Sequence, residues 1–431
     1  MQDSVSILSR GRRLPVGQIE RAAVPIDDTP HPAARRTLWL ALTVTLLVQF
    51  AQHATRPMAS YRALGLDASV EQLGYLALSF GALSIAIAIP IGRFVDRRGA
   101  RATTVGGIAL MGGAALGHSA AADLIGLIAA HTALGLGLIF AVVGLQAIVS
   151  HAGPAEGADA RFGLFGATIS LGQVLGPIAA GVMAEVVIAA GLAGPGDPYG
   201  TAPTFVLAGL LCASGAVAAL GLPRHPGGTG EARAVVEPGD GARPAGLGSV
   251  LRAPHMGKAL WASMVVLTAT DVLTVYLPAI GAERGWSVAF VSILLAVRAA
   301  LSFAVRVGTA PLVRMLGRRP LLVGACGIGA AALLLMTPAL PAWVAVVLMA
   351  ITGLVLGIGQ PLTMAWVSRS APEQLRATAL AVRLTANRVG QSLIPVAVGA
   401  VAALAGSGAI FLVLSALLVS TSVAVARSDL R

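Results

Sequence analysis

Charged side chains are scarce in this chain of 431 residues, where Asp, Glu, Lys and Arg together make up only 11%. A soluble domain carries about 25%, so these charges are too few to cover the surface of a water-soluble protein. The hydrophobic share of 56% also excludes a disordered chain. The sequence therefore predicts an integral membrane protein.

Cysteine and aromatic residues are also few. Cys212 and Cys326 lie in separate apolar segments, which argues against a structural disulfide. Aromatic residues form 4% of the chain, so no broad aromatic-lined drug cavity is evident. We find no Walker loop, metal-ligand cluster or Ser-His-Asp constellation, and therefore expect no cofactor, no metal, no ATP-driven pump and no enzyme.

Apolar windows without charged residues indicate how often the chain crosses the membrane. The windows Arg319–Arg369 and Arg388–Arg427 are each long enough for two helices of about 20 residues. The whole pattern predicts an all-α integral membrane protein with twelve transmembrane helices. We place them at 37–58, 70–92, 102–121, 124–148, 162–190, 203–222, 257–280, 286–309, 320–338, 342–366, 375–404 and 408–426.

Basic residues concentrate on one predicted side of the membrane. The opposite side holds only Arg56, Arg62 and Arg284. By the positive-inside rule, we expect both termini in the cytoplasm of a multi-pass protein of the inner or plasma membrane. The net charge of +11 then reflects topology, and no nucleic-acid partner is expected.

An internal repeat relates the two halves of the chain. A shift of 218 residues superimposes Gly172-Gln173 on Gly390-Gln391, and Pro177 on Pro395. The shift spans six helices, so both halves share one orientation, as in many transporters. The predicted units are a tail at 1–36, a six-helix bundle at 37–223, a linker at 224–256, a second six-helix bundle at 257–426, and a tail at 427–431.

The loop after the second predicted helix resembles the signature loop of the major facilitator superfamily. The matching residues are Gly92, Asp96, Arg97, Gly99 and Arg101. The resemblance covers nearly the whole chain and implies a twelve-helix bacterial-type transporter that works by alternating access. In such a protein, the loop is expected to latch one conformation, with Asp96 accepting hydrogen bonds from arginines or facing a helix N-terminus.

Two departures from the family pattern accompany this resemblance. The second copy of the loop carries Arg314 where the first has Asp96, and His131 stands where members often place an arginine.

A further segment is similar to the family's antiporter motif, although Ala180 replaces a usual glycine. Close helix packing explains that segment equally well. Its residues are Gly172, Gly176, Pro177 and Gly181.

Polar residues inside the predicted spans are costly in lipid and therefore mark a substrate and coupling cavity. They are Gln49, Gln52, His53, Asp271, Arg298, Gln360, Arg383, Asn387 and Gln391. Asp271 lies mid-membrane and can change its charge, so it is the predicted proton-coupling residue. Two alternatives stay open: Asp271 forms a structural pair with Arg298, or Arg383 extends to the interface.

These features predict a secondary active transporter for a small molecule, coupled to protons and acting as a monomer in the bilayer. Export of amphipathic compounds is the expected activity. The alternative is uptake or exchange of a small organic anion, because Arg298, Arg383 and Arg388 outnumber Asp271 at membrane depth. A channel is the alternative from a different class.

Overall fold

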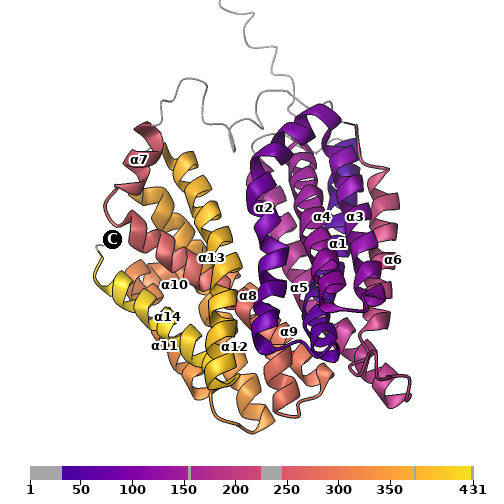
Figure 1. The fold of residues 1–431 in the computed structure, drawn as a ribbon. Helices are drawn as coiled ribbons and strands as arrows, with labels where there is room; N and C mark the ends of the chain where they lie inside the picture. The colour runs from indigo at the N-terminus through magenta and orange to yellow at the C-terminus, as the bar shows by residue number, and fades with distance from the viewer. Residues whose placement is uncertain (1–31, 154–156, 225–244, 373–374, 429–431) are drawn as a thin grey trace, which may run out of the picture.

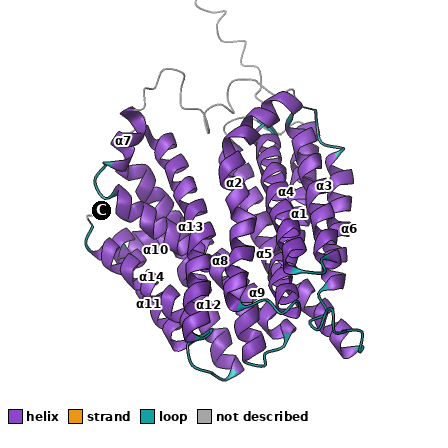
Figure 2. Cartoon of the chain, in the orientation of Figure 1, coloured by secondary structure: helices purple, strands orange, loops and turns teal. Residues whose placement is uncertain are grey.

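The computed structural model describes residues 32–153, 157–224, 245–372 and 375–428. These residues form helices joined by short loops (Figures 1 and 2). The helices are α1 (Pro32–Gly65), α2 (Val70–Arg98), α3 (Ala100–Ala120), α4 (Leu124–Ser150), α5 (Ala158–Ala189), α6 (Ala202–Ala219), α7 (Ala245–Leu251), α8 (Met256–Glu283), α9 (Val288–Val307), α10 (Thr309–Leu316), α11 (Arg318–Leu335), α12 (Ala342–Ser370), α13 (Arg376–Ala405) and α14 (Ala409–Ala426).

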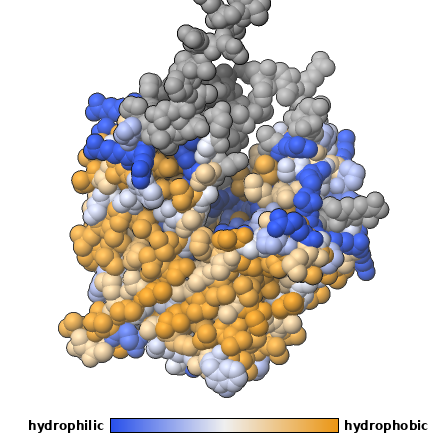
Figure 3. Space-filling model, turned by 180° about the vertical axis from the view of Figure 1, so that it is seen from behind, coloured by the Kyte–Doolittle hydropathy of each residue, from blue (hydrophilic) through white to orange (hydrophobic). Residues whose placement is uncertain are grey.

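Twelve of these helices have the length of a membrane span. Ten of the described helices are long and apolar enough to cross a bilayer, and α2 and α3 add 29 and 21 residues. Large apolar side chains such as Trp343 and Leu404 remain exposed, and Figure 3 shows a broad hydrophobic band across the face in view. The predicted all-α fold with twelve transmembrane helices is confirmed.

The structure corrects the end of the first predicted helix. We predicted residues 37–58, whereas α1 continues to Gly65 with Pro57 inside it. The extension is stable because Met58, Tyr61 and Ala63 are buried in the core. Arg56, which we placed near the outer end of this helix and counted on the side opposite the termini, therefore lies well inside α1.

Two short helices lie where no span was predicted. Helix α7 falls within the segment 224–256 that we predicted as a linker, and α10 follows α9 after a break at Gly308. Gly317 then ends α10 with a φ of 77°, and Gly99 ends α2 with a φ of 83°. Glycine suits both turns because other residues rarely adopt this backbone conformation. The two glycines are related by the 218-residue shift.

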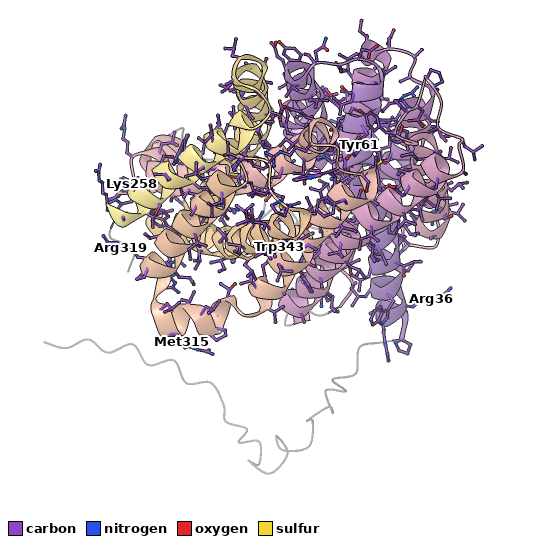
Figure 4. All side chains as sticks on the ribbon, turned by 90° about the horizontal axis from the view of Figure 1, so that it is seen from below. Arg36, Tyr61, Lys258, Met315, Arg319 and Trp343 are labelled. Atoms are coloured by element: carbon purple, nitrogen blue, oxygen red, sulfur yellow. The ribbon has the colours of Figure 1, made fainter. Side chains whose placement is uncertain are left out.

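Helices α1 to α6 form one bundle, and α8 to α14 form the other (Figure 1). We call the side on which α1 begins and α14 ends the terminal face, and the opposite side the far face. At the terminal face, Lys258 donates a 2.7 Å hydrogen bond to the carbonyl of Arg427, and Arg319 donates to that of Ala426. Figure 4, seen from below, shows Lys258 and Arg319 near each other on the left side of the molecule.

The two bundles meet through α2 with α13 and through α5 with α9. Glycines permit the approach: a methyl group on Gly74 of α2 would lie 2.9 Å from the Cα of Val396 of α13. At the repeat-related contact, a methyl group on Gly181 would lie 3.1 Å from the Cα of Ala289. These residues belong to the far-face parts of their helices. The bundles converge there and diverge toward the terminal face (Figure 1).

The repeat is also visible in the packing within each bundle. Gly135 of α4 lies against the backbone of Phe80, and Gly353 of α12 lies against the backbone of Arg298. Both pairs are related by the 218-residue shift. Arg298 therefore occupies in the second bundle the place that Phe80 occupies in the first.

Candidate functional site

An ion pair between the two bundles lies at the centre of the candidate site. Arg56 Nη1 of α1 donates to Asp271 Oδ1 of α8 at 2.7 Å, and both side chains are buried. A pair of opposite charges this close offsets part of the cost of burying each one. The alternative in which Asp271 pairs with Arg298 is therefore wrong in this structure, because Arg56 reaches the carboxylate instead.

Gln391 of α13 completes the surroundings of the carboxylate. Its Nε2 donates to Asp271 Oδ2, and its Oε1 accepts from Arg388 Nη1 at 3.5 Å. Both oxygens of Asp271 thus have a partner, one from each bundle. Three helices meet at this carboxylate, so a change in its charge acts on the contact between the bundles.

Phe80 and a histidine pair extend the site into the first bundle. The Arg56 guanidinium lies 4.5 Å from the centre of the Phe80 ring. The ring centres of Phe80 and His131 lie 5.2 Å apart. His131 Nδ1 lies 3.0 Å from His118 Nε2, and His118 Nδ1 lies 2.7 Å from the carbonyl of Ala114. Since a carbonyl only accepts, a neutral His118 carries its proton on Nδ1 and accepts from His131.

Phe80 and His118 did not emerge as site residues from the sequence. The 218-residue shift offered a signal for Phe80, because it aligns this residue with the predicted site residue Arg298. His118 gave no such signal, since its partner lies on the neighbouring helix.

The predicted polar residues of α1 lie beside the ion pair. Gln49 and Gln52 are buried, and His53 is partly buried, one turn before Arg56. His53 Nδ1 lies 2.8 Å from the carbonyl of Gln49, within its own helix. His53 therefore shares a face of α1 with Arg56, beside the ion pair.

Arg298 is buried near the middle of α9. Its Nε is buried without a hydrogen-bond partner, and no described residue accepts from its guanidinium. The charges of Asp271 and Arg56 act on it without direct contact. Arg298 thus belongs to the central site but has no carboxylate of its own.

The remaining predicted cavity residues lie on α12 and α13. Arg383, Asn387 and Gln391 follow a four-residue spacing and so share one face of α13. Asn387 is buried, and neither its oxygen nor its nitrogen has a partner among the described residues. For Gln360 of α12, the hydrogen bond present uses its backbone carbonyl, which accepts from Thr363. The described contacts do not bring Gln360 to Asp271.

The predicted latch loop lies at the terminal face. Arg97 is exposed, and Arg101 Nη1 donates to the carbonyl of Leu222 at 3.4 Å. The surroundings of Gly92 and Asp96 lie outside the part of the chain that the structure describes. The latch role of Asp96 stays a prediction.

The glycines of the antiporter-like segment lie at helix contacts. Methyl groups on Gly172 and Gly176 would lie 2.6 Å from Gln49 Cβ and 2.7 Å from the backbone nitrogen of Ala54, so α5 rests directly on α1. Pro177 lies inside α5, and Gly181 contacts α9 of the other bundle. The segment positions the part of α1 that carries the polar residues.

A polar site between two six-helix bundles defines the class of this chain as a membrane transport protein. Among the residues that the structure describes, no group of His, Cys, Asp or Glu side chains could hold a metal ion. The chain belongs to the Major Facilitator Superfamily, whose family model matches residues 39–395. No curated protein matches its sequence.

Solved transporter structures share the fold. The nucleoside transporter NupG aligns with a TM-score of 0.71 at 13% identity, covering 90% of this chain and 98% of that one. A D-xylose-proton symporter gives 0.69 at 16%, covering 91% and 97%. A bacterial homolog of the human lysosomal transporter Spinster, in an inward-facing and unoccupied conformation, gives 0.67 at 17%, covering 92% and 96%. At these identities the likeness concerns the fold alone.

Proposed function

We propose that this protein is a proton-coupled secondary active transporter whose two bundles rock around the Arg56–Asp271 site. The observation that carries the proposal is the buried ion pair between α1 and α8, which joins the two bundles at their centre. A proton on Asp271 removes the negative charge that holds Arg56. The contact between the bundles then weakens, and binding of a proton is coupled to their relative motion.

The distribution of charge supports a cytoplasmic terminal face. Exposed basic residues such as Arg97, Arg252 and Arg314 lie there. The two far-face exceptions serve the fold: Arg62 donates to the carbonyl of Ala121 at 2.7 Å, and Arg284 to that of Thr337 at 2.7 Å. With both termini in the cytoplasm of a plasma or inner membrane, the bundles are apart on the inside, and the conformation is inward-facing.

Export remains the proposed direction, with the antiporter-like segment of α5 as its support. Uptake or exchange of a small organic anion is the alternative, and the unpaired Arg298 favours an anionic substrate. The transporter is proposed to act as a monomer, since each chain holds a complete site between its own bundles.

Counterflow in proteoliposomes tests the carrier mechanism. The purified protein is reconstituted, and radiolabelled succinate, benzoate and an amphipathic cation are offered outside vesicles with or without the same unlabelled compound inside. A carrier gives faster accumulation of label when unlabelled compound is present inside, because the loaded protein reorients in both directions. Equal rates under both conditions for a compound that permeates would identify a channel and overturn the proposal.

A further inference from the structure

We propose that Arg298 is the primary binding residue for a small organic anion, held through a carboxylate or phosphate group in the central site. That the bound anion is the transported substrate rests on the proposed function. That an anion binds at all rests on the geometry of α8, α9 and α13.

The first step concerns the acids available to Arg298. Asp271 is the acidic residue whose charge acts on it, and both oxygens of that carboxylate already have partners in Arg56 and Gln391. Arg298 is only 8% exposed and lacks a hydrogen-bond acceptor among the described residues. A buried guanidinium without a counter-charge is unfavourable unless a ligand supplies one.

The second step concerns the charge of the whole centre. Arg388 also interacts electrostatically with Asp271 and Arg56, and its Nη1 donates to Gln391 Oε1 beside the carboxylate. Arg56, Arg298 and Arg388 thus surround a single carboxylate. The centre carries excess positive charge, which suits an anion and opposes a cationic substrate.

The third step concerns the groups that complete a binding site. Asn387 lies one helical turn before Gln391 on α13, and its buried amide offers a donor and an acceptor that no described residue uses. The planar fork of Arg298 binds two oxygens of a carboxylate or phosphate at once, whereas an amide recognises a second polar group of the ligand. The resulting ligand is a small anion with a further hydrogen-bonding group.

In the recess between the two bundles, Figure 3 shows hydrophilic residues above the hydrophobic band. The bundles diverge on this side. We take this side as the one from which an anion enters. On the far face, the glycine contacts of α2 with α13 and of α5 with α9 hold the bundles together.

Thermal unfolding of the full-length protein in detergent tests the site directly. Sodium succinate, sodium benzoate and sodium phosphate are compared with sodium chloride at equal ionic strength, and succinamide serves as the uncharged analogue of succinate. We expect at least one of the three anions to raise the melting temperature in a saturable manner, and succinamide not to do so, because ligand binding stabilises the folded state. The response to succinate, benzoate and phosphate separates a carboxylate site from a phosphate site.

Two substitutions assign the effect to Arg298. Arg298→Lys keeps the charge but loses the fork, so the apparent affinity for the stabilising anion falls about tenfold. Arg298→Gln loses the response and raises the melting temperature of the ligand-free protein, because an uncompensated buried charge is removed. A purely structural arginine would give the opposite sign. Arg252→Lys, at an exposed position, is the matched control and keeps the wild-type response.

Three results would overturn the proposal: an unchanged anion response in Arg298→Gln, equal stabilisation by succinamide, or no stabilisation of the wild type by any of the three anions. Counterflow separates this failure from that of the transport function. Exchange of neutral or cationic compounds without anion binding leaves the carrier and removes the anion site. Anion binding without exchange of any compound leaves the site and removes the carrier.

Discussion

Asp271→Asn is expected to abolish gradient-driven transport while energy-independent exchange continues. Asparagine has nearly the same shape as aspartate, and its single side-chain oxygen can still accept from Arg56. Its amide nitrogen takes the place of the oxygen that accepted from Gln391, so that contact is kept only if the Gln391 amide turns over and accepts through its own oxygen. What asparagine cannot do is bind and release a proton. The measurement is accumulation of labelled substrate in proteoliposomes under an imposed pH gradient, compared with counterflow in the same vesicles at equal pH on both sides.

Gln391→Glu is the comparison variant, at the side chain that donates to Asp271. It leaves Asp271 intact and adds a second titratable group to the same site. We expect it to retain gradient-driven transport with an altered pH profile. If Asp271→Asn still accumulates substrate against its gradient with the pH dependence of the wild type, Asp271 is not the coupling residue.

Arg56→Gln is expected to destabilise the protein by about 3–5 kcal/mol, the cost of leaving one partner of a buried ion pair without the other. Asp271 would keep only Gln391, in surroundings that lack another direct cationic partner. Thermal unfolding in detergent measures the loss. Arg36→Gln, at an exposed position near the start of α1, is the control and should leave the melting temperature unchanged.

The double variant Arg56→Gln/Asp271→Asn makes this prediction specific to the pair. Two neutral amides can hydrogen-bond to each other and need no counter-charge, so much of the lost stability should return. Independent losses that add in the double variant would show that the two side chains are not coupled in the folded protein.

The architecture could be predicted from the sequence because the bilayer constrains it strongly. Each span must be apolar and about 20 residues long, so the charge-free windows located the helices. The 218-residue shift predicted two equivalent bundles because glycines such as Gly135 and Gly353 are required at equivalent helix contacts. Asp271 and Gln391 could be selected because polar residues are costly at membrane depth.

The partners of these residues could not be predicted in the same way. The choice of Arg56 over Arg298 by Asp271 depends on how α1 and α8 approach each other across the two bundles, and no local pattern encodes that distance. The predicted helix at 37–58 also placed Arg56 too near the outer end, whereas burial of the residues after Pro57 continues α1 to Gly65. A proline is tolerated in a membrane helix when neighbouring helices enclose it.

The central claim is that the two bundles open and close around a site controlled by Asp271. Double electron–electron resonance tests it most directly, because it measures distances between spin labels on the two bundles. With Cys212 and Cys326 replaced by alanine, one spin-label pair at His151→Cys and Arg369→Cys reports on the terminal face. A second pair at Leu192→Cys and Ala339→Cys reports on the far face. Lowering the pH should populate a shorter distance in the terminal pair and a longer one in the far pair, in equal proportions. In Asp271→Asn both distributions should become independent of pH. A far-face pair that keeps one distance under every condition, or two pairs that lengthen together, would contradict the account.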